Sequence, residues 1–265
     1  MPEAQRPDIR LTGVSKSFGG PAGEIPAVAP LDLRLAGGSM TALVGPSGCG
    51  KSTLLRLIAG LERPSTGEIR IGEETPDDLR KRAALSVAFQ DAALLPWRTV
   101  AGNVALGRSL ARRPRDAGAV SELIDLVGLS GFEARRPAEL SGGMRQRAAI
   151  ARAMASAPEL LLLDEPFGAL DELTRDRLNA ELPALWEAHG ATSVLVTHSV
   201  AEAVRLADRI LVLSPRPARI AADITVELPR PRDGVVLASE AFRETCGQVS
   251  AALRDGQPPD RLAAQ

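Results

Sequence analysis

A glycine-rich segment early in the chain has the residue types and spacing of a phosphate-binding loop. The segment reads Gly45-Pro46-Ser47-Gly48-Cys49-Gly50-Lys51-Ser52-Thr53 and matches the pattern G-x-x-x-x-G-K-[ST] in full. Its glycines let backbone N–H groups face phosphate oxygens, Lys51 can reach the β- and γ-phosphates, and the Ser52 hydroxyl can ligate Mg²⁺. A glycine-rich turn without a ligand is the alternative. The pattern predicts a nucleoside triphosphate and Mg²⁺ as ligands, but by itself it leaves many enzyme classes open.

A second anion-binding element is predicted at residues 141–147, well after the phosphate loop. It reads Ser141-Gly142-Gly143-Met144-Arg145-Gln146-Arg147 and opens an alanine-rich segment typical of a long helix. A serine can cap such a helix, the two glycines expose its first N–H groups, and the helix dipole favours a negative charge there. Because the chain already has a complete phosphate loop, this second element indicates a chain with two phosphate-binding surfaces.

Two adjacent carboxylates follow a run of four leucines. Asp164 and Glu165 come directly after residues 160–163, which have the pattern of a buried strand. Burying two acids side by side is costly unless a cation or a water network uses them. We expect Asp164 to reach the Mg²⁺ shell through water and Glu165 to act as general base on the attacking water. Carboxylates that only cap a helix are the alternative.

His198 follows another predicted strand, residues 193–197. Ligands of α/β sheets bind at the carboxyl ends of the strands, so His198 is expected at the same edge as Asp164. From there its imidazole could contact the γ-phosphate or the attacking water. A histidine with a purely structural role is the alternative.

The elements that must position these groups alternate between strands and helices. Apolar patterns predict strands at 9–14, 31–35, 40–44, 69–71, 85–89, 160–163, 193–197, 209–213 and 224–228. Helices are predicted at 52–59, 141–156, 172–189 and 239–253, and a loop is predicted at 19–30. Pro183 should kink or divide the helix at 172–189. We interpret residues 1–90 and 158–214 as one α/β core that carries residues 91–157 as a helical insertion.

Composition excludes several classes of protein. The 265-residue chain is 45% hydrophobic and has a formal net charge of −1, so no global field would recruit nucleic acid or acidic lipid. Its two cysteines, Cys49 and Cys246, form neither a C-x-x-C pair nor a disulfide framework. No apolar run approaches the roughly 18 residues of a membrane-spanning helix, and residues 1–10 do not have the pattern of a signal peptide. These features favour an intracellular protein.

Six motifs, in order along residues 8–214, resemble those of the nucleotide-binding subunit of ATP-binding-cassette (ABC) transporters. They are residues 45–53 (Walker A), Gln90 (Q-loop), residues 141–147 (signature), residues 160–165 (Walker B), residues 169–171 (D-loop) and His198 (switch histidine). The resemblance implies an α/β fold, with a P-loop NTPase core, an N-terminal antiparallel β subdomain and an inserted α-helical subdomain at about 91–157. It also implies an ABC ATPase domain over residues 8–230 and a short C-terminal helical tail over residues 231–265.

The same resemblance assigns roles to individual residues, with ATP and Mg²⁺ as ligands. It gives catalytic roles to Glu165, His198 and Gln90, and Mg²⁺ ligation to Ser52, Gln90 and Asp164. ATP contacts fall to residues 45–53 and to Phe18, Ser141, Gly142, Gly143 and Asp171. In this family two copies meet head to tail. Ser141 and the N–H groups after it would therefore bind the γ-phosphate of ATP held by the partner subunit's Lys51.

Two positions depart from the family pattern. Met144 stands where the signature usually has glutamine, but the serine and the backbone donors carry the phosphate contact, so activity is expected to survive. The chain has no tyrosine, and the role of the aromatic residue that stacks on adenine falls to Phe18. An ordinary core residue is the alternative for Phe18, which leaves the nucleotide preference open.

The segment after Gln90 is expected to contact a membrane subunit. Leu94, Leu95 and Trp97 lie where the family receives the coupling helix of a permease, and core packing of Trp97 is the alternative. Residues 160–177 are most similar to importers of nitrate, sulfonate or taurine, and residues 225–232 resemble the aliphatic-sulfonate branch. The resemblance implies integral permease subunits, a periplasmic or extracellular solute-binding protein as indirect partner, and a peripheral position on the cytoplasmic face of the inner (plasma) membrane.

Two other functional assignments account for fewer of these sequence features. A soluble ABC ATPase of DNA repair or chromosome organisation would need a long heptad insertion or a basic surface that faces DNA, and the sequence has neither. A small-molecule kinase would leave residues 141–147 unexplained. We therefore predict an ATP-hydrolysing subunit that energises an importer of aliphatic sulfonate, taurine or nitrate-like anions, with no nucleic-acid partner.

Overall fold

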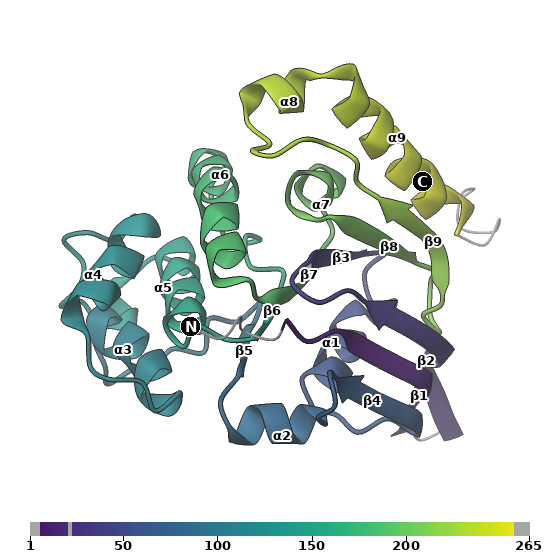
Figure 1. Ribbon diagram of the computed structural model, residues 1–265, viewed down its shortest axis with the longest axis horizontal. Helices are drawn as coiled ribbons and strands as arrows, with labels where there is room; N and C mark the ends of the chain where they lie inside the picture. The colour runs from purple at the N-terminus through teal and green to yellow at the C-terminus, as the bar shows by residue number, and fades with distance from the viewer. Residues whose placement is uncertain (1–5, 21–22, 257–265) are drawn as a thin grey trace.

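A six-stranded sheet in the order β5-β6-β7-β3-β8-β9 forms the centre of the molecule (Figure 1). The computed structural model describes residues 6–20 and 23–256. The strands are β3 Met40–Val44, β5 Leu85–Ala88, β6 Leu160–Asp164, β7 Thr192–Thr197, β8 Arg209–Leu213 and β9 Ile220–Thr225. Neighbouring strands run parallel, except that β9 is antiparallel to β8. Strands β3, β6 and β7 are buried along their whole length, as expected of parallel strands covered on both faces.

An antiparallel sheet in the order β2-β1-β4 lies beside this core (Figure 1). Its strands are β1 Ile9–Gly20, β2 Gly23–Leu35 and β4 Thr66–Ile71. The predicted loop at 19–30 is wrong, because β1 and β2 continue toward each other and pair as far as Gly20 and Gly23. β2 is an edge strand of this sheet, where prolines such as Pro26 and Pro30 are tolerated.

Helices cover both faces of the central sheet and form the predicted insertion. They are α1 Lys51–Ile58, α2 Pro76–Lys81, α3 Val100–Leu110, α4 Ala117–Leu126, α5 Gly142–Ala155, α6 Glu172–His189, α7 Val200–Leu206, α8 Gly234–Ala238 and α9 Glu240–Asp255, with a 3₁₀ turn η1 at Pro137–Glu139. Helices α3, α4 and α5 group at one side of the molecule (Figure 1). This arrangement confirms the predicted α/β fold with an antiparallel β subdomain and a helical insertion.

Two further predicted elements differ from the structure, and two short helices were not predicted. The helix at 172–189 is not divided: α6 continues through Pro183, and its residues Leu178 and Leu182 are fully buried in the core. The strand expected at 224–228 is β9, which begins earlier because it pairs with β8 as a hairpin. The short helices α2 and α8 were not predicted, although Thr75 and Asp78 form a capping box that is readable in the sequence.

Two hydrophobic clusters lie on the two faces of the central sheet. One joins the antiparallel sheet and α1 to the sheet, through side chains such as Leu11, Leu54 and Val194. The other joins the helical insertion and helices α6, α7 and α9 to the opposite face, and includes Ile150 and Val249. Helix α9 packs on α7, β8 and β9, so the last described helix shares the core of the rest of the chain.

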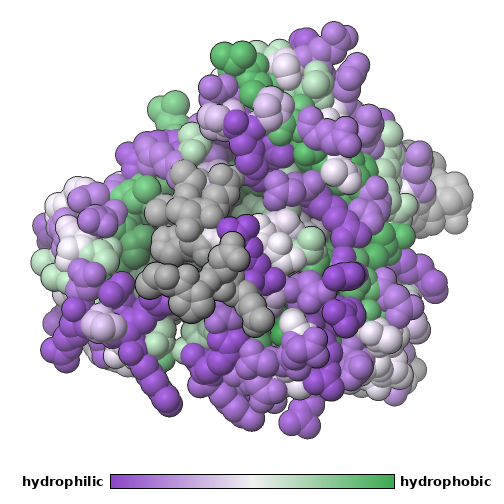
Figure 2. Space-filling view, viewed as in Figure 1, coloured by the Kyte–Doolittle hydropathy of each residue, from purple (hydrophilic) through white to green (hydrophobic). Residues whose placement is uncertain are grey.

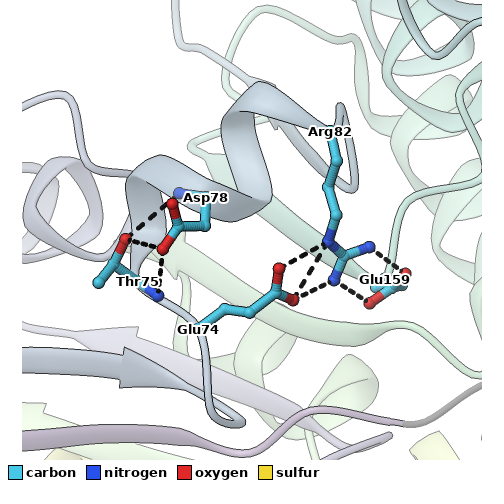
Figure 3. Close-up of polar contacts among 5 residues, drawn as sticks. All are labelled: Glu74, Thr75, Asp78, Arg82 and Glu159. Carbon is cyan, nitrogen blue, oxygen red and sulfur yellow. Dashed lines mark hydrogen bonds and ion pairs between the residues drawn. The ribbon is translucent and has the colours of Figure 1, made fainter.

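Arg82 fastens α2 to the edge of the central sheet (Figure 3). Its guanidinium donates to Glu74 Oε2 at 2.6 Å and to Glu159 Oε1 at 2.5 Å, the latter residue lying just before β6. Hydrogen bonds to Glu159 and Glu74 raise the pKa of Arg82 above its already high value. Paired donors of this kind match carboxylates in geometry as well as charge.

Figure 2 shows hydrophilic residues over most of one face, with smaller apolar patches between them. Within the described part of the chain, no helix is both long and apolar enough to cross a membrane.

Candidate functional site

The predicted phosphate loop lies between β3 and α1, and its backbone requires glycine. Gly48 and Gly50 have φ angles of 72° and 122°, which side-chain-bearing residues rarely adopt. A Cβ atom at Gly50 would lie 2.7 Å from the Ala27 carbonyl oxygen. The glycines of the motif are therefore fixed both by the turn and by the close packing of β2 against it.

A cavity of about 460 Å³ opens above this loop. Its lining comes from the phosphate loop, β2, the segment after β5, the end of β6 and the turn between β8 and β9. The lining residues are Ala27, Ser47, Gly48, Gly50, Lys51, Ser52, Thr53, Gln90, Glu165 and Arg216. The structure thus brings together Walker A, Gln90 and Glu165, which are distant in sequence.

Lys51 is almost fully buried at the start of α1. Its Nζ donates to the carbonyl oxygens of Gly45 at 2.7 Å and Pro46 at 3.0 Å. Gly45, Pro46 and Cys49 do not line the cavity, and Cys49 is buried beneath the loop. The carbonyl groups hold the ammonium group inside the loop, where an anion in the cavity can meet its charge.

Asp164 and Ser52 form the pair of oxygen donors that the sequence predicted for Mg²⁺. Ser52 Oγ donates to Asp164 Oδ1 at 2.9 Å. Burial raises the pKa of Asp164, an effect that the Ser52 hydrogen bond opposes and the neighbouring Glu165 charge adds to. Hydroxyl and carboxylate oxygens fit Mg²⁺. Gln90, the third Mg²⁺ ligand expected from the sequence, lines the same cavity as Ser52. The described residues contain no group of three or more His, Cys, Asp or Glu suited to a metal.

Glu165 and His198 face each other at the carboxyl edge of the sheet. His198 Nδ1 lies 3.4 Å from Glu165 Oε2. Glu165 has a φ of 47°, a conformation that is strained for a non-glycine residue and is common at functional sites. Its N–H donates to the Val196 carbonyl of β7 at 2.9 Å, which holds this conformation. Asp164, Glu165 and His198 therefore lie at the same edge of the sheet, as expected from the sequence.

The signature segment lies outside this cavity. Ser141 caps α5, with its Oγ accepting a hydrogen bond from the Met144 N–H at 3.2 Å, and both Ser141 and Gly142 are exposed. Asp171 caps α6 by accepting from the Thr174 N–H, which lowers the pKa of this aspartate. Neither Ser141 nor Asp171 lines the cavity that holds Lys51.

Phe18 does not line the cavity either. It pairs with Ile25 across the β1–β2 hairpin, and the Lys16 ammonium lies 4.8 Å from the centre of its ring. The described structure therefore places no aromatic side chain among the residues that line this cavity.

The segment after Gln90 is held by side chains that sequence reasoning did not single out. Gln146, buried within the signature helix, donates to the Phe89 carbonyl at 2.9 Å, directly before Gln90. Arg152, six residues later in the same helix, donates to the Ala92 and Ala93 carbonyls. Only the spacing of polar residues along one helix could have suggested that α5 holds the Q-loop.

Trp97 is exposed rather than packed in the core. The indole is 69% exposed, whereas Leu94 and Leu95 are half-buried. Buried Asn103 holds this turn, since its Oδ1 accepts from the Leu95 N–H at 2.8 Å and its Nδ2 donates to the Leu95 carbonyl. The core-packing alternative for Trp97 is wrong.

Comparison with known proteins identifies the family. The family described as ABC transporter matches residues 28–168 of the chain. The chain belongs to this family. It is 47% identical to an aliphatic sulfonates import ATP-binding protein of Burkholderia lata, over 94% of this chain and 73% of the relative. It is 49% identical to a protein of the same name from Rhodopseudomonas palustris, over 85% of this chain and 76% of the relative.

A solved structure has the same fold. It is the dimer of the ATP-binding cassette MJ0796 in a post-hydrolysis state, bound to ADP and Pi. The two share 31% sequence identity with a TM-score of 0.76, over 83% of this chain and 99% of that one. The present chain is an ABC ATPase that binds ATP, and neither the DNA-repair nor the kinase alternative is favoured.

Asp164→Asn should raise the free energy of unfolding of the nucleotide-free protein at pH 7. Burial disfavours the ionised carboxylate, and asparagine keeps an oxygen that accepts from Ser52. Because the pKa of Asp164 is raised on folding, the penalty is present above its folded pKa and disappears as pH falls below the unfolded value. Denaturant unfolding at pH 7 and in acid measures this difference.

Asp223→Asn is the control of opposite sign. A hydrogen bond from Arg209 lowers the pKa of Asp223, so its carboxylate stabilises the folded protein at pH 7. If Asp164→Asn also destabilised the protein at pH 7, burial would not be the dominant effect on Asp164.

Proposed function

We propose that this chain is the ATP-hydrolysing subunit of a membrane importer, and that it acts as a head-to-tail dimer around two ATP molecules. The observation that carries the proposal is the position of Ser141, exposed at the start of α5 and outside the cavity of its own Lys51. A serine cap with free helix N–H groups is suited to phosphate, but here it needs a nucleotide held by another copy. The dimeric ATP-binding cassette with 31% identity supports this arrangement.

Within each site, we assign the roles by position in the cavity or by contact with a residue that lines it, as for Asp164 and His198. Lys51 and the backbone of residues 45–53 bind the phosphates, and Ser52, Asp164 and Gln90 hold Mg²⁺, which neutralises phosphate charge when bound. Glu165 accepts a proton from the attacking water, and His198, 3.4 Å from it, orients the water or the γ-phosphate. Gly142 and Gly143 act with Ser141 on the partner's nucleotide, Asp171 lies at the contact between copies, and Phe18 is the candidate platform for adenine.

Glu165→Gln should lower the rate of ATP hydrolysis by about 10²–10⁴-fold, because the amide cannot accept the proton. ATP binding should remain, and an ATP-bound dimer should accumulate. Steady-state hydrolysis, equilibrium binding and size-exclusion chromatography measure the three effects. Glu122→Gln is the matched control, since Glu122 is exposed on α4 and does not line the cavity. Unchanged hydrolysis in Glu165→Gln would remove this residue from the role of base.

We assign the permease contact to the surface around Trp97. The exposed indole stands beside half-buried Leu94 and Leu95, on a turn that Asn103 holds firmly. An apolar helix docked on Leu94, Leu95 and Trp97 would be linked along the chain to Gln90, which lines the nucleotide cavity. This connection supports the surface around Trp97 as the point of coupling.

The cargo we propose is an aliphatic sulfonate, with taurine and nitrate-like anions as related candidates. The basis is the printed name of relatives that are 47% and 49% identical. The chain would then act at the cytoplasmic face of the inner membrane, with a solute-binding protein as indirect partner. We also propose the division into an ATPase domain at residues 8–230 and a C-terminal tail at 231–265.

Trp97→Ala should reduce sulfonate-stimulated ATP hydrolysis by about 10-fold in the complex reconstituted with its permease and binding protein. This is the loss expected when an aromatic side chain that is buried in the interface with a partner is removed. Hydrolysis by the isolated chain should not change. Val235→Ala is the control, because Val235 is an apolar residue 80% exposed on α8. Full stimulation in Trp97→Ala would exclude this contact surface, and stimulation by other solutes but not by sulfonates would exclude the cargo.

A further inference from the structure

Arg216 lines the nucleotide cavity, although none of the six family motifs contains it. It lies in the turn between β8 and β9 and shares the cavity wall with Ser47 and Gly48 of the phosphate loop. Its Nε donates to the Pro26 carbonyl at 3.0 Å, which anchors the guanidinium beside β2. The other four N–H groups of the guanidinium lie on its two terminal nitrogens.

The turn that carries Arg216 is hydrogen-bonded to β2 and packs against the phosphate loop. Ala218 donates to the Ala27 carbonyl and accepts from the Ala29 N–H, both at 3.0 Å. A Cβ atom at Gly50 would lie 3.1 Å from the Ala218 Cβ, so the turn and the phosphate loop are in direct contact. Within the turn, Ser214 Oγ accepts from the Arg219 N–H and donates to the Pro215 carbonyl. The position of Arg216 relative to the loop is therefore set by backbone contacts.

The charges of the cavity favour an anion at this position. Among its described lining residues, Lys51 and Arg216 are the cations and Glu165 is the acid. Lys51 lies inside the loop, hydrogen-bonded to two carbonyl groups, whereas Arg216 is exposed at the cavity wall. A guanidinium presents paired donors that fit phosphate oxygens better than a lysine does.

We propose that Arg216 binds the phosphates of the nucleotide, as a second cation supplied by the β8–β9 turn. The proposal rests on ATP binding by this family and not on transport, so it is tested on the isolated full-length chain. Failure of the importer assignment would leave it intact.

The test compares Arg216→Gln with Arg219→Gln by titration with Mg²⁺-ATP. Arg219 is an exposed arginine of the same turn that does not line the cavity. Arg216→Gln should raise the Kd for ATP by about 10-fold at low salt, the lower end expected for a hydrogen bond to a charged group. Arg219→Gln should leave it within about 2-fold, and Arg216→Lys should recover part of the loss.

Salt separates a phosphate contact from one with the base or ribose. If Arg216 meets phosphate charge, the loss in Arg216→Gln should shrink at high ionic strength, because salt screens exposed charges. The proposal would be overturned by an unchanged Kd in Arg216→Gln, by an equal loss in Arg219→Gln, or by a loss that salt does not alter. Thermal unfolding of each variant without nucleotide should match that of the wild type. The proposal would also be overturned if Arg216→Gln had a lowered Tm while Arg216→Lys kept both the wild-type Tm and normal ATP binding, because the loss of binding would then come from lost stability.

Discussion

The parallel pairing of β6, β7 and β3 is the constraint on which the rest of the site depends. Val44 pairs with Thr197, and Asp164 pairs with Val196, so the three strands end at one level. The residues that follow them are the phosphate loop, Glu165 and His198. Because side chains alternate along a strand, a shift of one residue would turn Asp164 away from Ser52. The buried Leu and Val residues of these strands fix the register, and thereby the distances among the functional groups.

The same constraint explains what could be predicted from the sequence. Strands β3 and β8 were predicted with their observed bounds, because buried apolar runs with abrupt ends leave little choice. The phosphate loop and the acids after β6 were also readable, since each lies next to such a run. Where structure depends on partners far away in the sequence, local patterns failed. Residues 19–30 form paired strands because β1 provides the partner for β2, and this pairing overrides their glycines and prolines.

Arg216 and Gln146 were missed for a related reason. Arg216 reaches the cavity only because Ala218 bridges the β8–β9 turn to β2. Gln146 meets Phe89 only because α5 packs beside β5. No pattern within the β8–β9 turn indicates the contact of Arg216, and the spacing of polar residues along α5 is the only local signal for the contact of Gln146. The exposure of Trp97 could not be read from its residue type, since tryptophan is buried in most surroundings and Asn103 decides the path of the turn here.

The groups in the cavity and directly beside it are arranged for binding rather than for the stability of the folded chain. Asp164 is buried as a carboxylate next to Glu165, and Lys51 satisfies its ammonium group on two carbonyls of the loop. Such groups are costly without a ligand, and a nucleotide with Mg²⁺ would supply the missing charges. Ser141 does not line this cavity. Its position outside the cavity leads to the central claim that each ATP is enclosed by two copies of the chain.

Mixing two inactive variants tests that claim most directly. Lys51→Ala removes the lysine of the phosphate loop, and Ser141→Asp keeps a good helix cap while repelling phosphate. Each variant alone should lack hydrolysis. In a mixed dimer, the phosphate loop of the Ser141→Asp chain faces the intact signature of the Lys51→Ala chain, so one complete site forms and ATP hydrolysis should reappear on mixing. If the mixture stayed as inactive as its components although mixed dimers form, or if Ser141→Asp alone hydrolysed ATP at the wild-type rate, the composite site would be contradicted.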